Sequence, residues 1–136
     1  MDVVGKYKEQ AITTQQRGRL IVMLYEGAVR FLETAKLKLG EGNYALKGVY
    51  IGKAQDIVTE LSNSLNPDAA PDMAQDLRSL YSFIYRRLNE ANIERSVTKI
   101  DECIGILNEL KGAWEEVCAS PEPAATDQAG AGGFQA

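Results

Sequence analysis

Apolar residues recur every three or four positions along most of this chain, which is the spacing of one face of an amphipathic helix. The first such stretch runs from about Gln16 to Leu39. Its stripe consists of Leu20, Ile21, Leu24, Ala28, Phe31, Leu32, Ala35 and Leu39. The pattern then breaks, and we expect Gly40 to cap this helix and Asn43 to cap the start of the next.

The second helix is predicted to end near Leu65, because Asn66 precedes Pro67 and the residue before a proline disfavours helical angles. Its inner stripe is predicted to be Tyr50, Ala54, Ile57, Leu61 and Leu65. Pro71 and Asp72 suit the first turn of a third helix, where proline is tolerated and an acid complements the helix dipole. Its apolar face consists of Leu77, Leu80, Tyr81, Ile84, Leu88 and Ala91.

Asn92 is predicted to mark a short break before a fourth helix that ends near Cys118. The apolar face of that helix consists of Val97, Ile100, Ile104, Leu107, Leu110, Trp114 and Val117. No segment alternates as a strand would, so we predict an all-α fold, an antiparallel up-down four-helix bundle over residues 16–118. A short N-terminal segment over 1–15 precedes the bundle. The tail over 119–136 is predicted to be disordered, because Phe134 is its only large apolar side chain.

The composition excludes several classes of protein. The 136 residues include no histidine, which removes Ser-His-Asp and Cys-His catalysis and every histidine-ligated metal or haem site. The net charge of -4 argues against a nucleic-acid partner, which needs a basic face. No apolar run could cross a membrane and the N-terminus lacks a signal-peptide core, so we expect no membrane insertion and a cytosolic location.

The cysteines and carboxylates suggest no chemistry of their own. Cys103 and Cys118 fall in one predicted helix, about 22 Å apart, so they cannot form a disulfide with each other. Carboxylate pairs one turn apart are interpreted as a solvated face, because a two-metal helical bundle needs histidine partners. These pairs are Asp56 with Glu60 and Asp72 with Asp76. We therefore predict no catalytic residue, metal site or cofactor.

Two groups of residues are unusual for an ordinary bundle. Glycine costs about 1 kcal/mol relative to alanine inside a helix, and the predicted helices contain Gly27, Gly48, Gly52, Gly105 and Gly112. These glycines allow close packing within the bundle or the approach of a partner's backbone. The first three helices also carry Tyr25, Tyr50, Tyr81 and Tyr85. Such tyrosines fit either boundary positions or a half-wet binding groove.

The stretch from Leu20 to Ala28, LIVMLYEGA, resembles the signature of the FliS family of flagellar secretion chaperones. Further matches are Lys53-Ala54, Ile57, Glu60-Leu61, Ser64-Leu65, Leu77, Leu80-Tyr81, Arg87-Leu88, Ala91-Asn92, Leu107, Leu110 and Ala113-Trp114. Tyr7 also fits the family, and the resemblance covers about residues 3–117. The chain departs from the family before the first helix, where Gln15-Gln16-Arg17-Gly18 replaces a frequent Ser-Pro pair.

The resemblance implies a cytosolic chaperone that binds the disordered C-terminal segment of flagellin, prevents premature polymerisation and delivers it for type III secretion. It also implies contacts with a component of the flagellar export gate and with other flagellar regulatory factors, and no enzymatic activity. Two alternatives stay open from the residues alone. One is a helical adaptor that acts through self-association, and the other is an enzyme or metal-binding bundle.

The predicted client-binding residues follow from the family motif for Tyr7 and Tyr25 and from spacing and surface chemistry for the others. The set is Tyr7, Ile21, Tyr25, Tyr50, Ile57, Leu61, Leu65, Tyr81, Ile84 and Tyr85. Val4, Tyr7 and Ala11 lie at helical spacing in the N-terminal segment. We predict that this segment covers part of the groove until flagellin displaces it.

Overall fold

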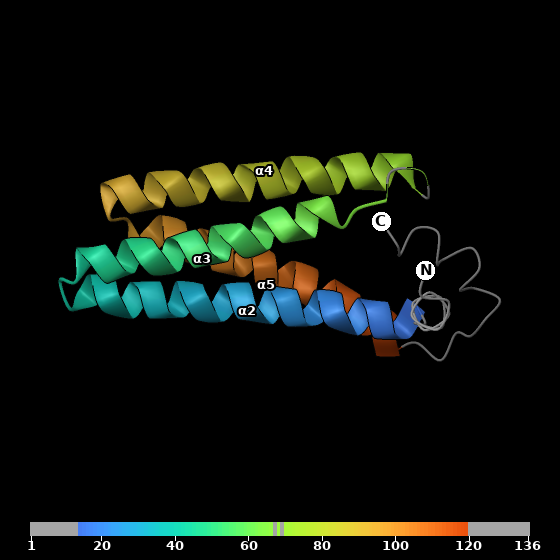
Figure 1. The fold of residues 1–136 in the computed structure, drawn as a ribbon, viewed down its shortest axis with the longest axis horizontal. Coiled ribbons are helices and arrows are strands. Elements are labelled where there is room, and N and C mark those ends of the chain that lie inside the picture. Colours follow the sequence, from blue (N-terminus) through green and yellow to red (C-terminus); the bar gives the residue numbers. More distant parts are fainter. Residues whose placement is uncertain (1–13, 67, 69, 120–136) are drawn as a thin grey trace, which may run out of the picture.

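The computed structural model describes residues 14–66, 68 and 70–119, with side chains from Arg17 onward. This part of the chain forms α2 (Thr14–Gly40), α3 (Tyr44–Asn63), α4 (Pro71–Glu94) and α5 (Val97–Ala119). No strand occurs among these residues, and consecutive helices run in opposite directions (Figure 1). The predicted all-α antiparallel bundle is therefore confirmed. The predictions for residues 1–13 and for the tail from Ser120 lie outside the described residues.

The helices form a four-membered ring around one core. Helix α2 packs against α3 and α5, and α4 packs against the same two helices on the other side. Helices α2 and α4 are therefore diagonal to each other, as are α3 and α5. The largest side chains of the core come from all four helices. They are Tyr25, Leu32, Ile51, Leu61, Ile84, Leu88, Ile100, Leu107, Val58 and Cys103.

The predicted stripes are partly out of phase with the core. On α3 the buried stripe contains Ile51 and Val58, whereas Tyr50 and Ile57 are only partly buried. The reason is that Tyr50 and Ile57 face the neighbouring α2 rather than the centre of the bundle. On α2, Leu20 is 54% exposed, so its predicted place in the core was wrong.

The ends of α5 also differ from the prediction. Val97 and Val117 are 42% and 46% exposed, so their predicted places on the buried face were wrong. The centre of the predicted face is confirmed, since Ile100, Ile104, Leu107 and Trp114 are buried.

The turn between α2 and α3 depends on Gly42 rather than Gly40. Gly42 has a φ of 78° and its N–H donates to the Leu39 carbonyl at 3.0 Å. The Asn43 N–H donates to the Lys38 carbonyl at 2.9 Å, which completes a Schellman motif. The predicted cap at Gly40 was wrong because the helix continues through that residue. Asn43 is confirmed as the next N-cap, since its side chain accepts the Leu46 N–H at 3.1 Å.

The turn between α4 and α5 lies at Arg95 and Ser96, so the predicted break at Asn92 was wrong. Arg95 adopts the left-handed conformation with φ 55°, and the Ser96 N–H donates to the Ala91 carbonyl at 3.0 Å. The Arg95 guanidinium lies 3.7 Å from the centre of the Tyr44 ring, a cation–π contact that helps to hold this turn. Asn92 instead accepts hydrogen bonds from the Lys47 ammonium, 2.8 Å from its carbonyl oxygen.

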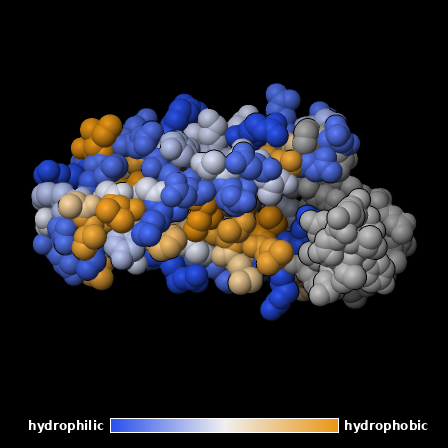
Figure 2. Space-filling view, viewed as in Figure 1, coloured by the Kyte–Doolittle hydropathy of each residue, from blue (hydrophilic) through white to orange (hydrophobic). Residues whose placement is uncertain are grey.

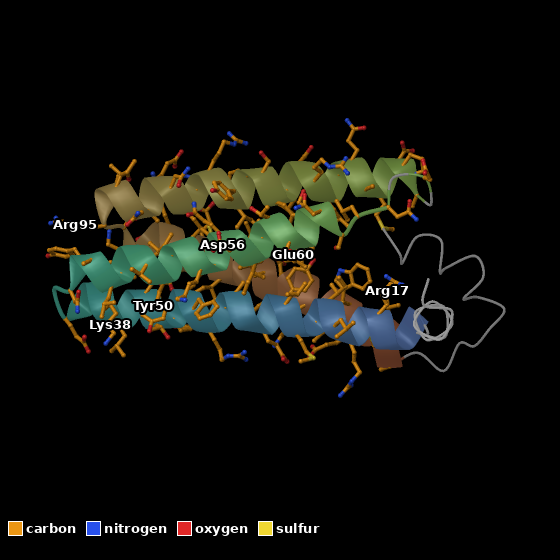
Figure 3. The ribbon with its side chains drawn as sticks, in the orientation of Figure 1. Arg17, Lys38, Tyr50, Asp56, Glu60 and Arg95 are labelled. Atoms are coloured by element: carbon orange, nitrogen blue, oxygen red, sulfur yellow. The ribbon has the colours of Figure 1, made fainter. Side chains whose placement is uncertain are left out.

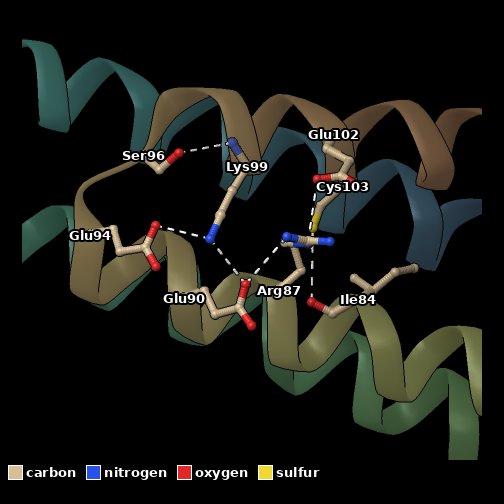
Figure 4. Close-up of polar contacts among 8 residues, drawn as sticks. All are labelled: Ile84, Arg87, Glu90, Glu94, Ser96, Lys99, Glu102 and Cys103. Carbon is tan, nitrogen blue, oxygen red and sulfur yellow. Dashed lines mark hydrogen bonds and ion pairs between the residues drawn. The ribbon is translucent and has the colours of Figure 1, made fainter.

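A network of ion pairs joins α4 and α5 near this turn (Figure 4). Glu90 accepts from Arg87 at 3.3 Å and from Lys99 at 3.1 Å. Arg87 also pairs with Glu102 at 3.4 Å, and Lys99 pairs with Glu94 at 2.9 Å. Because these groups are solvated, each pair adds little to stability, and the network chiefly sets how the two helices align.

Candidate binding surface

Helix α3 packs closely on a glycine of α2. A Cβ atom on Gly27 would lie 3.2 Å from the Cδ1 atom of Ile57. Farther along the same side, the ring centres of Phe31 and Tyr50 lie 6.1 Å apart. Gly27 therefore has a packing role, whereas a Cβ on Gly52, Gly105 or Gly112 would meet no atom within 4 Å.

These contacts define an apolar strip that we call the α2–α3 seam, formed by Leu20, Leu24, Phe31, Tyr50 and Ile57. The α2 members are spaced four and seven residues apart and share one side of the helix. All five side chains keep some exposure, and Leu20 keeps the most. Figure 2 shows apolar surface over α2 and α3, and Figure 3 shows Tyr50 between these two helices. The seam is thus one edge of the core that solvent can reach.

The structure places nine of the ten predicted client-binding residues in three groups. Tyr25, Leu61, Tyr81 and Ile84 lie in the core with at most 2% of their surface exposed. Ile21, Tyr50, Ile57 and Leu65 are partly buried at its edge, and Tyr85 is 39% exposed. Tyr7 lies outside the described residues. The contact role of every member stays a prediction, but only the second and third groups offer surface to a partner here.

The buried tyrosines have a structural explanation. The hydroxyl oxygens of Tyr25 and Tyr81 lie 2.5 Å apart, and the Trp114 side chain also hydrogen-bonds to Tyr25. Burial raises the pKa of both phenols well above the usual value, so both stay neutral. Tyr25, which lies in the LIVMLYEGA stretch, therefore connects α2, α4 and α5 within the core.

A pocket of about 330 Å³ lies between α3 and α4. Its lining residues are Val58, Thr59, Ser62, Asn63, Arg78, Tyr81, Ser82, Tyr85 and Arg86. Polar contacts join the two helices beside it, since the Gln55 amide donates to the Tyr85 carbonyl at 3.1 Å and to Asn89 at 2.8 Å. Sequence reasoning missed this pocket. The available signal was the polar stripe of Arg78, Ser82 and Arg86 at four-residue steps along α4.

The described residues suggest no cofactor chemistry. Within residues 14–66, 68 and 70–119, no three histidine, cysteine or acidic side chains are grouped so that they could hold a metal ion. Burial raises the pKa of the Cys103 thiol to about 12, so this sulfur is an unreactive core group. None of the helices in this part of the chain is long and apolar enough to span a membrane.

A four-helix bundle with a half-exposed apolar seam and an adjoining polar pocket is typical of a small helical protein that binds other polypeptides. The family model described as Flagellar protein FliS matches residues 2–121. The chain belongs to the FliS family of flagellar secretion chaperones.

Relatives from distant bacteria share this match along most of their length. A flagellar secretion chaperone FliS of Escherichia coli is 32% identical over 114 residues, which cover 83% of this chain and 84% of the relative. The FliS chaperone of Vibrio cholerae is 30% identical over 115 residues, with 82% and 85% covered. That of Bacillus subtilis is 28% identical over 128 residues, with 94% and 92% covered.

Proposed function

We propose that this chaperone binds the C-terminal segment of flagellin in the bacterial cytosol, prevents its premature polymerisation and delivers it for secretion. Family membership is the observation that carries the proposal, because the relatives are named flagellar secretion chaperones. We further propose that it acts by binding alone, without catalysis.

The α2–α3 seam supports this mechanism physically. A client segment that is disordered when free loses conformational entropy on binding, so the chaperone must offer apolar surface to offset that loss. An amphipathic client helix could place side chains at three- and four-residue spacing onto the seam. A segment held in this way is unavailable for contacts in a filament, and occlusion alone would block polymerisation.

The proposed contact residues are those that keep accessible surface. From the predicted set these are Ile21, Tyr50, Ile57, Leu65 and Tyr85, and the seam adds Leu20, Leu24 and Phe31. Tyr25, Leu61, Tyr81 and Ile84 would support the client only indirectly, by holding the helices in place. Tyr7 stays a proposed contact from the family motif.

Co-purification with flagellin tests the proposal. Full-length flagellin should be retained by the chaperone, whereas flagellin that lacks its C-terminal segment should not. Binding of the truncated form would contradict the proposed mechanism. No binding of either form would favour the adaptor alternative, which predicts concentration-dependent self-association in analytical ultracentrifugation.

Two exposed leucines on α2 provide a matched pair of variants. Leu20 belongs to the seam, whereas Leu37 is similarly exposed, at 59%, and is not one of the seam residues. We expect Leu20→Asp to weaken flagellin binding about tenfold, which corresponds to the loss of one apolar side chain from an interface. Leu37→Asp should leave the affinity unchanged. Equal effects of the two substitutions would remove the seam from the binding site.

A further inference from the structure

We propose that the pocket between α3 and α4 is a carboxylate-binding subsite that receives acidic side chains of the client segment. The proposal rests on the proposed function, since it takes flagellin to be the client. It adds a polar, charge-specific contact to a surface that is otherwise apolar. The residues that line the pocket have the chemistry that a carboxylate-binding site needs.

The pocket is lined by basic and neutral groups and by no acid, although the protein as a whole carries a net charge of -4. Arg78 and Arg86 supply two guanidinium groups, and Thr59, Ser62 and Ser82 supply hydroxyl donors. Val58 and Tyr81 form an apolar part of the wall. Guanidinium groups bind carboxylates through paired hydrogen bonds, so this wall suits a carboxylate better than a cation or a purely apolar side chain.

The two arginines form no salt bridge within the described residues, although Arg86 contributes, after Lys99 and Arg87, to the lowered pKa of Glu90. None of the ion pairs formed by the described residues includes Arg78 or Arg86. The neighbouring Arg87 contrasts with them, because it is held by Glu90 and Glu102 on the other side of α4. The guanidinium groups of Arg78 and Arg86 are thus not committed to a salt bridge with an acid of the described residues.

The spacing of the arginines indicates what kind of segment would fit. Arg78 and Arg86 are eight residues apart on α4, which places them about 12 Å apart along the helix axis. A client helix aligned with α4 would meet both guanidinium groups with carboxylates separated by two helical turns. Outside the pocket lining, the outer face of α3 carries Asp56 and Glu60 (Figure 3). These acids confine the attraction for carboxylates to the pocket itself.

The test compares two double variants of the full chain. Arg78→Gln with Arg86→Gln neutralises the pocket. As a control, Lys36→Gln with Lys111→Gln neutralises Lys36, which pairs with Asp101 of α5, and one lysine of α5, neither of which lines the seam or the pocket. Affinity for monomeric full-length flagellin is measured by titration calorimetry at 50 and 300 mM NaCl. We expect the pocket variant to bind about tenfold more weakly at low salt and to lose most of the salt dependence. The control should remain within about twofold of the unsubstituted protein.

A third variant separates charge from shape. Arg78→Lys with Arg86→Lys keeps both charges and should keep most of the salt dependence, and helical circular dichroism verifies that each variant is folded. Equal affinities of the pocket and control variants at both salt concentrations would overturn the subsite while leaving flagellin binding intact. Absence of binding by the unsubstituted protein would overturn the proposed function, and the subsite with it.

Discussion

The hydroxyl oxygens of Tyr25 and Tyr81 lie 2.5 Å apart and join α2 to α4, which are diagonal in the bundle. Tyr25 has a second partner in Trp114 of α5, whereas the hydrogen bond described for the Tyr81 hydroxyl is the one to Tyr25. The pair therefore links α2, α4 and α5 through hydrogen bonds inside the core. Tyr81 also lines the pocket, so the same hydrogen bond lies beneath the proposed subsite.

Removing either hydroxyl should destabilise the bundle, and unequally. Tyr25→Phe leaves both the Tyr81 hydroxyl and the Trp114 side chain without their hydrogen-bond partner, whereas Tyr81→Phe leaves the Tyr25–Trp114 bond in place. We expect losses of about 2–3 kcal/mol for Tyr25→Phe and about 1 kcal/mol for Tyr81→Phe in urea unfolding. The double variant should lose less than the sum, because the two hydroxyls share one bond. Strict additivity would show that they do not interact.

The buried thiol of Cys103 should make stability depend on alkaline pH. Burial raises its pKa to about 12, whereas an unfolded cysteine titrates near 8.5–9. The unfolded chain therefore releases its proton first, so this contribution is complete below about pH 8.5 and is lost as the pH rises toward 12. The expected slope is about -1.4 kcal/mol per pH unit above pH 9.

Unfolding measured between pH 8.5 and 9.5 reports mainly on this contribution, because phenols of the unfolded chain titrate near pH 10. Cys103→Ser should flatten the slope, whatever its effect on stability at pH 7. Cys118→Ser is the control, since that thiol is only partly buried and should account for less of the slope. A slope unchanged by Cys103→Ser would mean that another group is responsible.

Glycine substitutions should distinguish the packed glycine from the open ones. Gly105→Ala meets no atom within 4 Å and should raise the free energy of unfolding by about 0.5–1 kcal/mol through helix propensity. Gly27→Ala should gain less, because Ile57 must move by a few tenths of an ångström. Gly27→Val should lose about 1–3 kcal/mol through overpacking. The three variants are compared by urea unfolding, and equal gains at Gly27 and Gly105 would refute the close contact of α3 with α2.

The helices of this bundle were predictable because their signals are local. Three- and four-residue spacing, Asn43 and the Asn66-Pro67 pair act within one or two turns of the chain. The phase of each stripe was not predictable in the same way. Ile57 and Ile51 are equally apolar, and only the approach of α3 to Gly27 determines which one faces α2 and which enters the core.

The turns and the pocket illustrate the same limit. Gly40 and Gly42 both suit a C-cap by residue type, and the hydrogen bonds of Lys38 and Leu39 determine which one takes the left-handed conformation. Arg95 has that left-handed conformation although arginine rarely does. The hydrogen bond from the Ser96 N–H to the Ala91 carbonyl and the cation–π contact of Arg95 with Tyr44 stabilise it. The pocket depends on the packing of α3 against α4, so the stripe of Arg78, Ser82 and Arg86 indicates only the wall that α4 supplies.

Deleting residues 1–12 should test whether the N-terminal segment competes with the client. We predict that Val4, Tyr7 and Ala11 cover part of the groove in the free chaperone, so flagellin must displace them before it binds. The truncated protein should then associate faster in stopped-flow fluorescence, with Trp114 as the intrinsic reporter. Tyr7→Ala alone should give part of the acceleration, because it removes the largest side chain of the three. Circular dichroism checks that the bundle is intact, and unchanged association rates in both intact variants would show that the segment does not cover the groove.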